Sequence, residues 1–213
     1  MRFQTVLLDL DGTLVDHFAA IHRCHAYAMT RLGLPAPTPA QVRAAVGGGL
    51  ENAIRRLAGP EHVAAVLPLF RAHMEETMLD DVTALPGAHA LLTALRAAGV
   101  RTAVLTNKHG PAARRICEHL GLAPLLAAVV GAGDTEWLKP DVRLTAHTLA
   151  LLDGDATGTL LIGDSPYDVA TARAAALPCW CVTTGTHTEA ELGPAGADRI
   201  FSDLDEITAA LAD

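Results

Sequence analysis

The 213-residue sequence predicts an α/β protein in which a doubly wound parallel sheet carries an inserted helical domain. From about Pro86 onward, short apolar runs alternate with helical stretches, and this alternation is typical of a parallel sheet. Residues 16–85 break the alternation, because they contain no β-branched run and are spaced like several helices. We therefore expect a core domain made of residues 1–15 and 86–213, with a helical cap domain at residues 16–85.

The first element is the apolar run that begins at Phe3, which we expect to be a buried parallel strand ending at Gly12. Asp9 and Asp11 lie where this strand ends, and buried charges are costly unless they are paired or bind a metal. Side chains two positions apart on an extended segment point the same way, so both carboxylates can face one crevice. The alternative is a pair of loop carboxylates that cap backbone amides.

The inserted segment is expected to form four helices, at His17–Leu32, Pro39–Val46, Leu50–Leu57 and His62–Met78. The proline-rich stretch 34–39 and the glycines 47–49 separate them. An insert directly after the first strand would lie over that strand's carboxyl end. It is therefore interpreted as a lid, with hinges near Val15–His17 and Leu85–Gly87.

The rest of the core follows in order. Helices are expected at Ala88–Ala98, Pro111–Leu120, Val142–Leu152, Pro166–Ala176 and Leu204–Leu211, several of them followed by glycine. Apolar runs of strand length lie at Val100–Leu105, Ala127–Val130, Thr159–Ile162, Cys179–Val182 and Arg199–Phe201.

The composition limits the classes of binding partner and the cellular locations to be expected. The net charge of -8 argues against nucleic acid and against an anionic membrane surface. The N-terminal apolar run is too short for a signal peptide, and no segment approaches the length of a membrane span. The four cysteines show no disulfide spacing, and Cys179 and Cys181 would share one face of a strand as small buried residues. A reduced, cytoplasmic protein is the simplest interpretation.

Three further motifs follow core strands. Thr106-Asn107 ends the second one, where a hydroxyl and backbone amides could bind a phosphate oxygen. Lys139-Pro140 opens a helix, and the lysine matters only if it points into the crevice. In Gly163–Asp168, Ser165 and Asp168 are explained by helix capping, whereas Asp164 is left as a ligand for a hard cation. Several carboxylates in one crevice would repel one another without a divalent cation, and oxygen ligands indicate Mg²⁺.

In this order and spacing, the four motifs closely resemble those of the haloacid dehalogenase superfamily, in particular its phosphoglycolate-phosphatase-like branch. The first motif, Asp-x-Asp-Gly-Thr, stands here as Asp9–Thr13. The others match Thr106-Asn107, Lys139-Pro140 and Gly163–Asp168. The helical insert resembles the family's C1 cap, so the resemblance covers nearly the whole chain and implies a Rossmann-like core.

The resemblance implies a role for each matched residue. Asp9 would be the nucleophile that forms an aspartyl-phosphate, and Asp11 would protonate the leaving group and then activate water. The remaining roles divide into metal binding and phosphate binding. Mg²⁺ would be held by Asp9, the backbone carbonyl of Asp11 and Asp164, with Asp168 orienting that site; phosphoryl oxygens would be bound by Thr106, Asn107 and Lys139. An aspartate at position 11 also favours phosphoryl transfer over carbon–halogen cleavage.

The sequence leaves alternative roles open for several residues in and near the predicted cap. His17 stands where relatives often have Ser or Thr, so it is either a surface residue at a helix start or a substrate contact. Gly48 and Gly49 form either a substrate-facing turn or a simple break between helices. Arg55 could reach a substrate carboxylate. The roles of Lys108 and His109, beside the second motif, are left open.

These observations predict a Mg²⁺-dependent phosphomonoesterase acting on a small phosphorylated metabolite, with phosphoglycolate as the first substrate to name. A β-phosphoglucomutase-like phosphotransferase of the same fold is the nearest alternative. A phospho-receiver module or a non-enzymatic binding protein is the alternative from another class. The sequence leaves the oligomeric state open.

Overall fold

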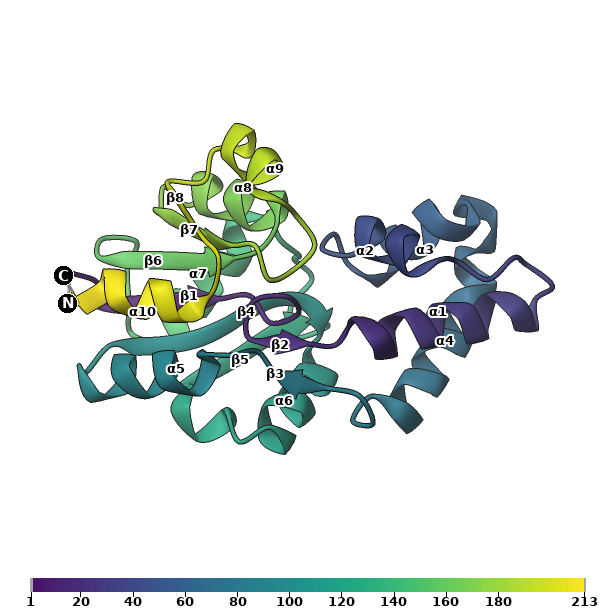
Figure 1. Ribbon diagram of the computed structural model, residues 1–213, viewed down its shortest axis with the longest axis horizontal. Coiled ribbons are helices and arrows are strands. Elements are labelled where there is room, and N and C mark those ends of the chain that lie inside the picture. Colours follow the sequence, from purple (N-terminus) through teal and green to yellow (C-terminus); the bar gives the residue numbers. More distant parts are fainter. Residues whose placement is uncertain (1, 213) are drawn as a thin grey trace.

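The computed structural model describes residues 2–212 and has a six-stranded parallel sheet at its centre (Figure 1). The strand order is β5-β4-β1-β6-β7-β8, so the first strand lies in the middle with later strands on both sides. The strands are β1 (Thr5–Leu8), β4 (Arg101–His109), β5 (Ala128–Ala132), β6 (Thr159–Gly163), β7 (Cys179–Val182) and β8 (Arg199–Phe201). The predicted doubly wound parallel sheet is confirmed.

Helices cover both faces of this sheet, because successive strand residues point to opposite sides. Leu8 packs in one apolar cluster with α5 (Ala88–Ala97), α6 (Gly110–His119) and α10 (Leu204–Ala212). Leu7 packs in a second cluster with α7 (Val142–Leu151), α8 (Pro166–Ala174) and α9 (Glu189–Ala195). The core is built mainly from Leu, Val, Ile and Ala side chains, with a smaller share of Phe, Met, Cys and Trp.

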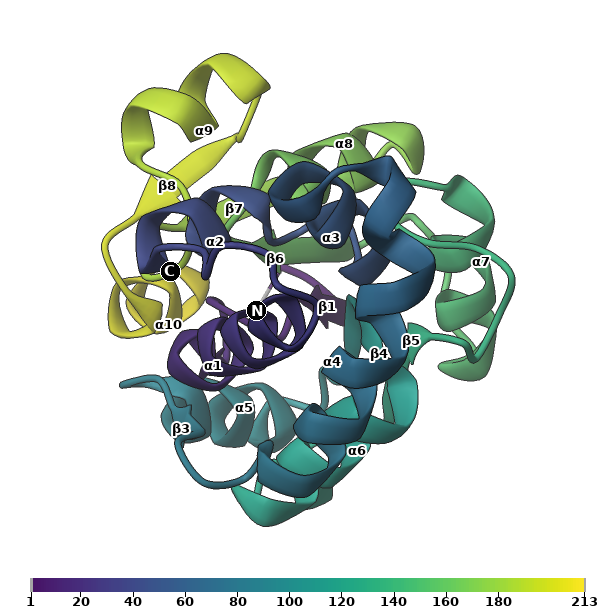
Figure 2. The same cartoon turned by 90° about the vertical axis from the view of Figure 1, so that its right-hand side faces the viewer.

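A separate group of helices is inserted between two short strands, β2 (Val15–Asp16) and β3 (Thr83–Ala84). The insert contains α1 (Phe18–Arg31), α2 (Pro39–Ala45), α3 (Leu50–Ala58), a 3-10 turn at Pro60–His62 and α4 (Val63–Thr77). These helices pack on one another beyond one end of the sheet, as Figure 1 shows on its right-hand side and Figure 2 shows end-on. Both crossings of the chain between sheet and insert pass through the antiparallel β2–β3 pair.

Three features of the fold were not predicted. The β2–β3 pair escapes detection because each strand has only two residues. α9 begins with a capping box, in which Glu191 accepts hydrogen bonds from both the amide and the hydroxyl of Thr188. The helix was not predicted because Gly193 and Pro194, which have low helix propensity, interrupt its sequence pattern. β4 continues to His109 because a shift in its pairing with β5 keeps the strand extended beyond Leu105.

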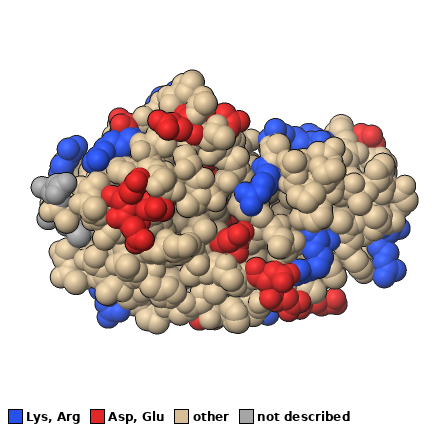
Figure 3. Space-filling model, in the orientation of Figure 1, with Lys and Arg blue, Asp and Glu red and all other residues tan. Residues whose placement is uncertain are grey.

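No helix within residues 2–212 is long and apolar enough to cross a membrane. On the face shown in Figure 3, Lys and Arg side chains are scattered rather than joined into one basic surface, and acidic groups lie between them. The surface on that side thus agrees with the overall negative charge.

Candidate active site

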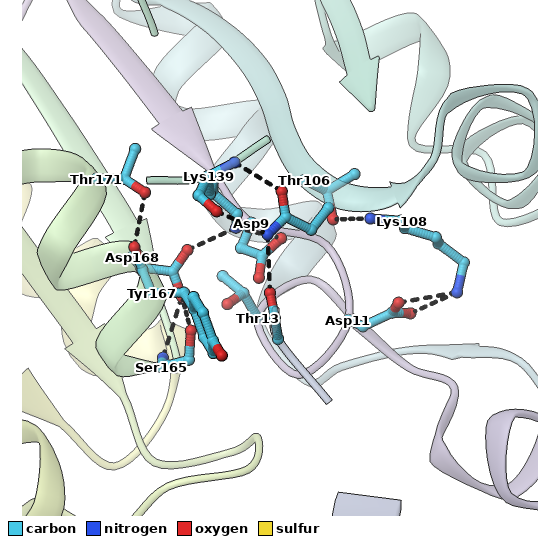
Figure 4. Close-up of polar contacts among 12 residues, drawn as sticks. Asp9, Asp11, Thr13, Thr106, Lys108, Lys139, Ser165, Tyr167, Asp168 and Thr171 are labelled. Atoms are coloured by element: carbon cyan, nitrogen blue, oxygen red, sulfur yellow. Dashed lines mark hydrogen bonds and ion pairs between the residues drawn. The ribbon is translucent and has the colours of Figure 1, made fainter. Parts of the chain in front are cut away.

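A group of buried carboxylates lies where β1 and β6 end (Figure 4). Asp9 directly follows β1, Asp164 directly follows β6, and Asp168 lies in the first turn of α8. One oxygen of each side chain lies within 4.8 Å of the others, and all three residues are buried. They are the only group of three or more His, Cys, Asp and Glu residues with metal-binding spacing among residues 2–212.

Lys139 is the cation of this group. Its side chain is buried, and its Nζ donates a hydrogen bond of 2.7 Å to Asp168 Oδ1. The same Nζ lies 2.9 Å from Asp9 Oδ1 and forms an ion pair with it. The geometry of this contact is not that of a hydrogen bond, so Asp9 Oδ1 has no hydrogen-bond donor among the described residues. Burial opposes the charged form of Lys139, but attraction to Asp168 and Asp9 outweighs it and raises the pKa of the ammonium.

One lysine does not balance three carboxylates. Burial raises the pKa of Asp9 to about 6, although the attraction of Lys139 opposes this shift. Burial, followed by the charges of Asp168 and Asp9, raises the pKa of Asp164 to about 8. The shifts have the direction expected of a site that lacks a further positive charge.

Asp164 is held by two threonines. Thr13 Oγ1 donates to Asp164 Oδ1 at 3.3 Å, and the amide and hydroxyl of Thr186 donate to Oδ2 at 2.9 and 3.0 Å. The chain passes so close at Gly185 that a Cβ there would meet Asp164 Oδ2 at 1.9 Å. Thr13 belongs to the first motif, but nothing in the sequence pattern indicates that Thr186 reaches this carboxylate.

The two carboxylate oxygens of Asp168 have partners of different kinds. Its Oδ1 accepts the bond from Lys139, while its Oδ2 accepts from the amides of Asp164 and Ser165 and from the Ser165 hydroxyl. The residue therefore caps α8 and orients Lys139 through the same carboxylate. The capping role that the sequence indicates for Asp168 is present in the structure.

Thr106 and Asn107 lie within β4 rather than after it. Thr106 lines the cavity described below, and its Oγ1 accepts a hydrogen bond from the Lys108 amide. The Asn107 side chain donates to the carbonyls of Gly47 and Lys139 and accepts from the Lys139 amide. Asn107 therefore joins the end of β4 to the Lys139 loop and to the glycine turn of the insert.

The Asp11 carboxylate lies apart from the Asp9 group. In Figure 4 it points toward Lys108, whose Nζ lies 2.8 and 3.0 Å from its two oxygens. His17 contacts the same lysine and is fully buried, so the expectation of a surface residue at this position is wrong. This prediction failed because the neighbouring sequence indicates only that His17 precedes a helix. It gives no sign that the ring is buried between Lys108 and the carbonyl of Met78.

A cavity of about 770 Å³ separates these residues from the insert. The predicted cap residues Gly48, Gly49 and Arg55 line it together with Asp9 and Asp11. Its opposite wall is largely apolar and includes Ile21, Val46, Leu50, Phe70, Met74 and Met78. The glycine turn is therefore on the cavity side, as one of the two interpretations of Gly48 and Gly49 expects.

Contacts on the α2–α3 side hold the insert against the core. Asn52 Nδ2 donates to Tyr167 Oη at 3.2 Å, and Arg43 donates to the carbonyl of Gly185 at 3.1 Å. A Cβ at Gly48 would lie 2.5 Å from both Asn52 Nδ2 and Tyr167 Oη. A larger residue here would have to displace Asn52 or Tyr167, so the absence of a side chain at Gly48 lets the turn approach α8 this closely.

The loop before Lys139 is anchored by an aromatic side chain. Trp137 is half-buried, its ring lies edge-on to His147, and the Arg143 guanidinium stacks over it. The Thr135 hydroxyl accepts a hydrogen bond from the Trp137 amide. These contacts fix the chain two residues before the lysine.

The cysteines take no part in this site. Cys24, Cys117, Cys179 and Cys181 are all buried free thiols. The thiols of Cys179 and Cys181 lie 3.8 Å apart in β7, packed in the cluster under α7 and α8.

A parallel sheet with buried carboxylates and a lysine at its strand ends, facing a cavity beneath a helical insert, defines an α/β enzyme with an acidic active centre. The chain belongs to the haloacid dehalogenase-like hydrolase family, whose sequence model matches residues 6–182. Its place in that family is the phosphoglycolate-phosphatase-like branch.

Relatives and solved structures support this placement. The protein named "Phosphoglycolate phosphatase, plasmid" from Cupriavidus necator is 34% identical over 212 residues, covering 97% of this chain and 92% of that protein. The phosphoglycolate phosphatase of Rhodospirillum rubrum is also 34% identical, covering 94% of this chain and 88% of that protein. The crystal structure of a predicted phosphatase from Clostridium acetobutylicum superposes with a TM-score of 0.91 at 26% identity, covering 99% and 98% of the two chains.

Proposed function

We propose that the protein is a Mg²⁺-dependent phosphatase that hydrolyses a small phosphomonoester through an aspartyl-phosphate intermediate, and that phosphoglycolate is the first substrate to test. The names of its relatives support the reaction class. The observation that carries the proposal is the position of Asp9. It is a buried carboxylate at the cavity floor, flanked by Lys139 and two further carboxylates.

The residues present fit a divalent cation. Asp9 and Asp164 have raised pKa values, and Asp9 Oδ1 has no hydrogen-bond donor among the described residues. Oxygen ligands of this kind suit Mg²⁺. We propose Asp9, Asp164 and the backbone carbonyl of Asp11 as its ligands, with Asp168 in support. The ion supplies positive charge that offsets the negative charge of carboxylates and phosphate.

The reaction divides into two steps, each with one proton transfer. Asp9 attacks phosphorus while the bond between phosphorus and the leaving oxygen breaks, and Asp11 donates a proton to that oxygen. Asp11 then accepts a proton from water, whose oxygen attacks phosphorus, releases inorganic phosphate and restores Asp9. Lys139 and Thr106 bind phosphoryl oxygens, with the backbone at Asn107, because the Asn107 side chain is already engaged in three hydrogen bonds.

The insert, residues 16–85, serves as a cap that excludes bulk water from the cavity. Arg55 is an exposed cation on the cavity wall and is placed to meet an anionic group of the substrate. Gly48 and Gly49 let the backbone approach the substrate closely. The composition and the charge pattern support a cytoplasmic enzyme without a nucleic-acid or membrane partner.

The test is phosphate release from phosphoglycolate, sugar phosphates and nucleoside monophosphates, with Mg²⁺ and with chelator. Asp9→Asn, which keeps the shape of the side chain, is run beside the unaltered protein. We expect release that needs Mg²⁺ and disappears in the variant, while circular dichroism shows an unchanged fold. Substantial residual activity of Asp9→Asn would refute the covalent mechanism, and release from no ester would refute the phosphatase assignment.

A further inference from the structure

Lys108 forms the closest contacts of Asp11. Its Nζ lies 2.8 Å from Asp11 Oδ2 and 3.0 Å from Oδ1, so the ammonium spans both oxygens of the carboxylate. The two side chains are 9% and 12% exposed, which shields the pair from water. The contact is thus a partly buried ion pair, and such a pair restricts the rotamer of both partners more strongly than a surface pair does.

His17 completes the coordination of the ammonium. Its Nδ1 lies 2.8 Å from Lys108 Nζ, and an ammonium has donors but no acceptor, so Nδ1 accepts. The ring proton therefore sits on Nε2, which donates to the carbonyl of Met78 at 2.7 Å. All three ammonium protons of Lys108 thus have acceptors: two in Asp11 and one in His17.

The chain of contacts joins distant segments. Lys108 belongs to β4, Asp11 follows β1, His17 follows β2, and Met78 ends α4 shortly before β3. Both crossings between core and insert are therefore tied to one lysine, which in turn holds Asp11. Figure 4 shows the contact between Lys108 and Asp11 to one side of the Asp9 group, with the Lys108 side chain folded back toward Asp11.

We propose that Lys108 is a positioning residue that orients the Asp11 carboxylate for its proton transfers, and that His17 orients Lys108. This inference rests on the proposed function, because it concerns the group that exchanges protons with the leaving oxygen and with water. Lys108 acts through Asp11: without it, the carboxylate of a loop residue is free to adopt other rotamers. His17 acts one step further away, by fixing the lysine from the side of the insert.

A double-mutant cycle tests whether Lys108 acts through Asp11. The variants are Lys108→Met, Asp11→Asn and the combination, each measured as kcat/KM with phosphoglycolate and with p-nitrophenyl phosphate. We expect Asp11→Asn to cost about 100-fold or more on the alkyl ester, since general acid catalysis contributes about 100- to 10,000-fold. Lys108→Met is expected to cost about 10-fold or more, a smaller factor because the Asp11 carboxyl is still present. The combination is expected to cost no more than Asp11→Asn alone.

The leaving group provides the second readout. Nitrophenolate leaves readily without a proton, so Lys108→Met should cost several-fold less on the p-nitrophenyl ester than on phosphoglycolate. A variant that only disturbed the fold would lower kcat/KM on both esters by the same factor. Lys108→Arg keeps a positive charge at this position and is expected to recover part of the loss, and it also serves as the second variant if Lys108→Met unfolds.

A matched pair of histidine variants tests the outer contact. Like His17, His22 directs its Nε2 to a backbone carbonyl, that of Pro37, but it lies outside the cavity. We expect His17→Gln to reproduce the leaving-group dependence of Lys108→Met in weaker form, whereas His22→Gln leaves kcat/KM unchanged on both esters.

The outcomes separate this inference from the proposed function. If the unaltered protein releases no phosphate from any ester, both fail. If it is active but the losses of Lys108→Met and Asp11→Asn multiply, or if Lys108→Met affects both esters equally, only the positioning role is refuted.

Discussion

Lys139 shows how strongly a single buried charge can determine both stability and chemistry. Its ammonium is buried between the carboxylates of Asp168 and Asp9. A buried ion pair contributes little over an apolar substitute, yet removal of one partner leaves the other charge unpaired. We therefore expect the lysine to matter for stability as well as for the phosphate binding proposed above.

We predict that Lys139→Met lowers the free energy of unfolding by about 3–5 kcal/mol, because it leaves two buried carboxylates without their cation. Urea unfolding monitored by circular dichroism measures this loss. Arg114→Met is the matched control, since Arg114 forms an ion pair with Asp134 at 2.8 Å on the surface. That variant should lose less than about 1 kcal/mol, and equal losses would contradict the argument.

A second prediction concerns the metal. Mg²⁺ should raise the melting temperature of the unaltered protein, because an ion that binds only the folded state stabilises it, by about 2.7 kcal/mol at a hundred times the dissociation constant. Asp164→Asn should abolish this Mg²⁺-dependent increase while keeping the shape of the side chain, because its amide oxygen can still accept from Thr186 and its NH2 group can donate to the Thr13 hydroxyl. Differential scanning calorimetry with Mg²⁺ and with chelator measures both, and an unchanged Mg²⁺ effect in the variant would remove Asp164 from the ligand set.

At the scale of elements, the glycine turn and α8 are fitted to each other. Gly47 accepts a hydrogen bond from Asn107, and the close approach of Gly48 to Tyr167 leaves no room for a side chain. The turn thus sets the distance between the cap and the strand ends. Its sequence signal is only three consecutive glycines, which a loop of any kind can contain.

We predict that Gly48→Val displaces the turn from α8 and changes the ranking of substrates more than it changes stability. A Cβ at this position meets Tyr167 as well as Asn52 Nδ2, so removing one of the two obstacles, in Gly48→Val combined with Tyr167→Ala, should recover part of the original substrate preference. The measurements are kcat/KM over the panel of esters and the melting temperature of each variant. Equal losses on every ester, unaffected by the second change, would argue against a role in substrate choice.

For the whole molecule, acid sensitivity follows from imidazoles that are buried without charge. Burial lowers the pKa of His25 to about 4, and its ring packs against Phe70 at 4.5 Å. In the unfolded chain the same group has a pKa near 6.5, so between pH 6.5 and 4 the unfolded state binds more protons. The contribution of His25 to stability is therefore complete above pH 6.5 and is lost as the pH falls toward 4.

We predict that His25→Leu reduces this acid-side loss, since one such histidine accounts for up to about 3 kcal/mol. The difference in melting temperature between pH 7 and pH 4.5 should be smaller in His25→Leu than in the unaltered protein. His119→Leu, at an exposed position at the end of α6, should keep the original difference. A difference that is the same in all three proteins would show that His25 does not contribute.

The extent to which the sequence predicts this molecule depends on the range of each interaction. The strands and most helices follow from local apolar periodicity, and Asp9, Lys139 and Asp164 are predicted because each follows or precedes a recognisable element. Lys108 and Thr186 are not, because their partners are 97 and 22 residues away along the chain. A side chain that reaches across strands leaves no periodic signal.

The anchored loop before Lys139 has a spectroscopic consequence. The protein has two tryptophans, and Trp180 is enclosed in the core between Phe3 and Phe201. The fluorescence of Trp180 should be insensitive to ligands, whereas the half-exposed Trp137 lies two residues from Lys139, the lysine proposed to bind phosphate. Emission from Trp137 in a Trp180→Phe background therefore offers an intrinsic signal for occupancy of the cavity, without any added label.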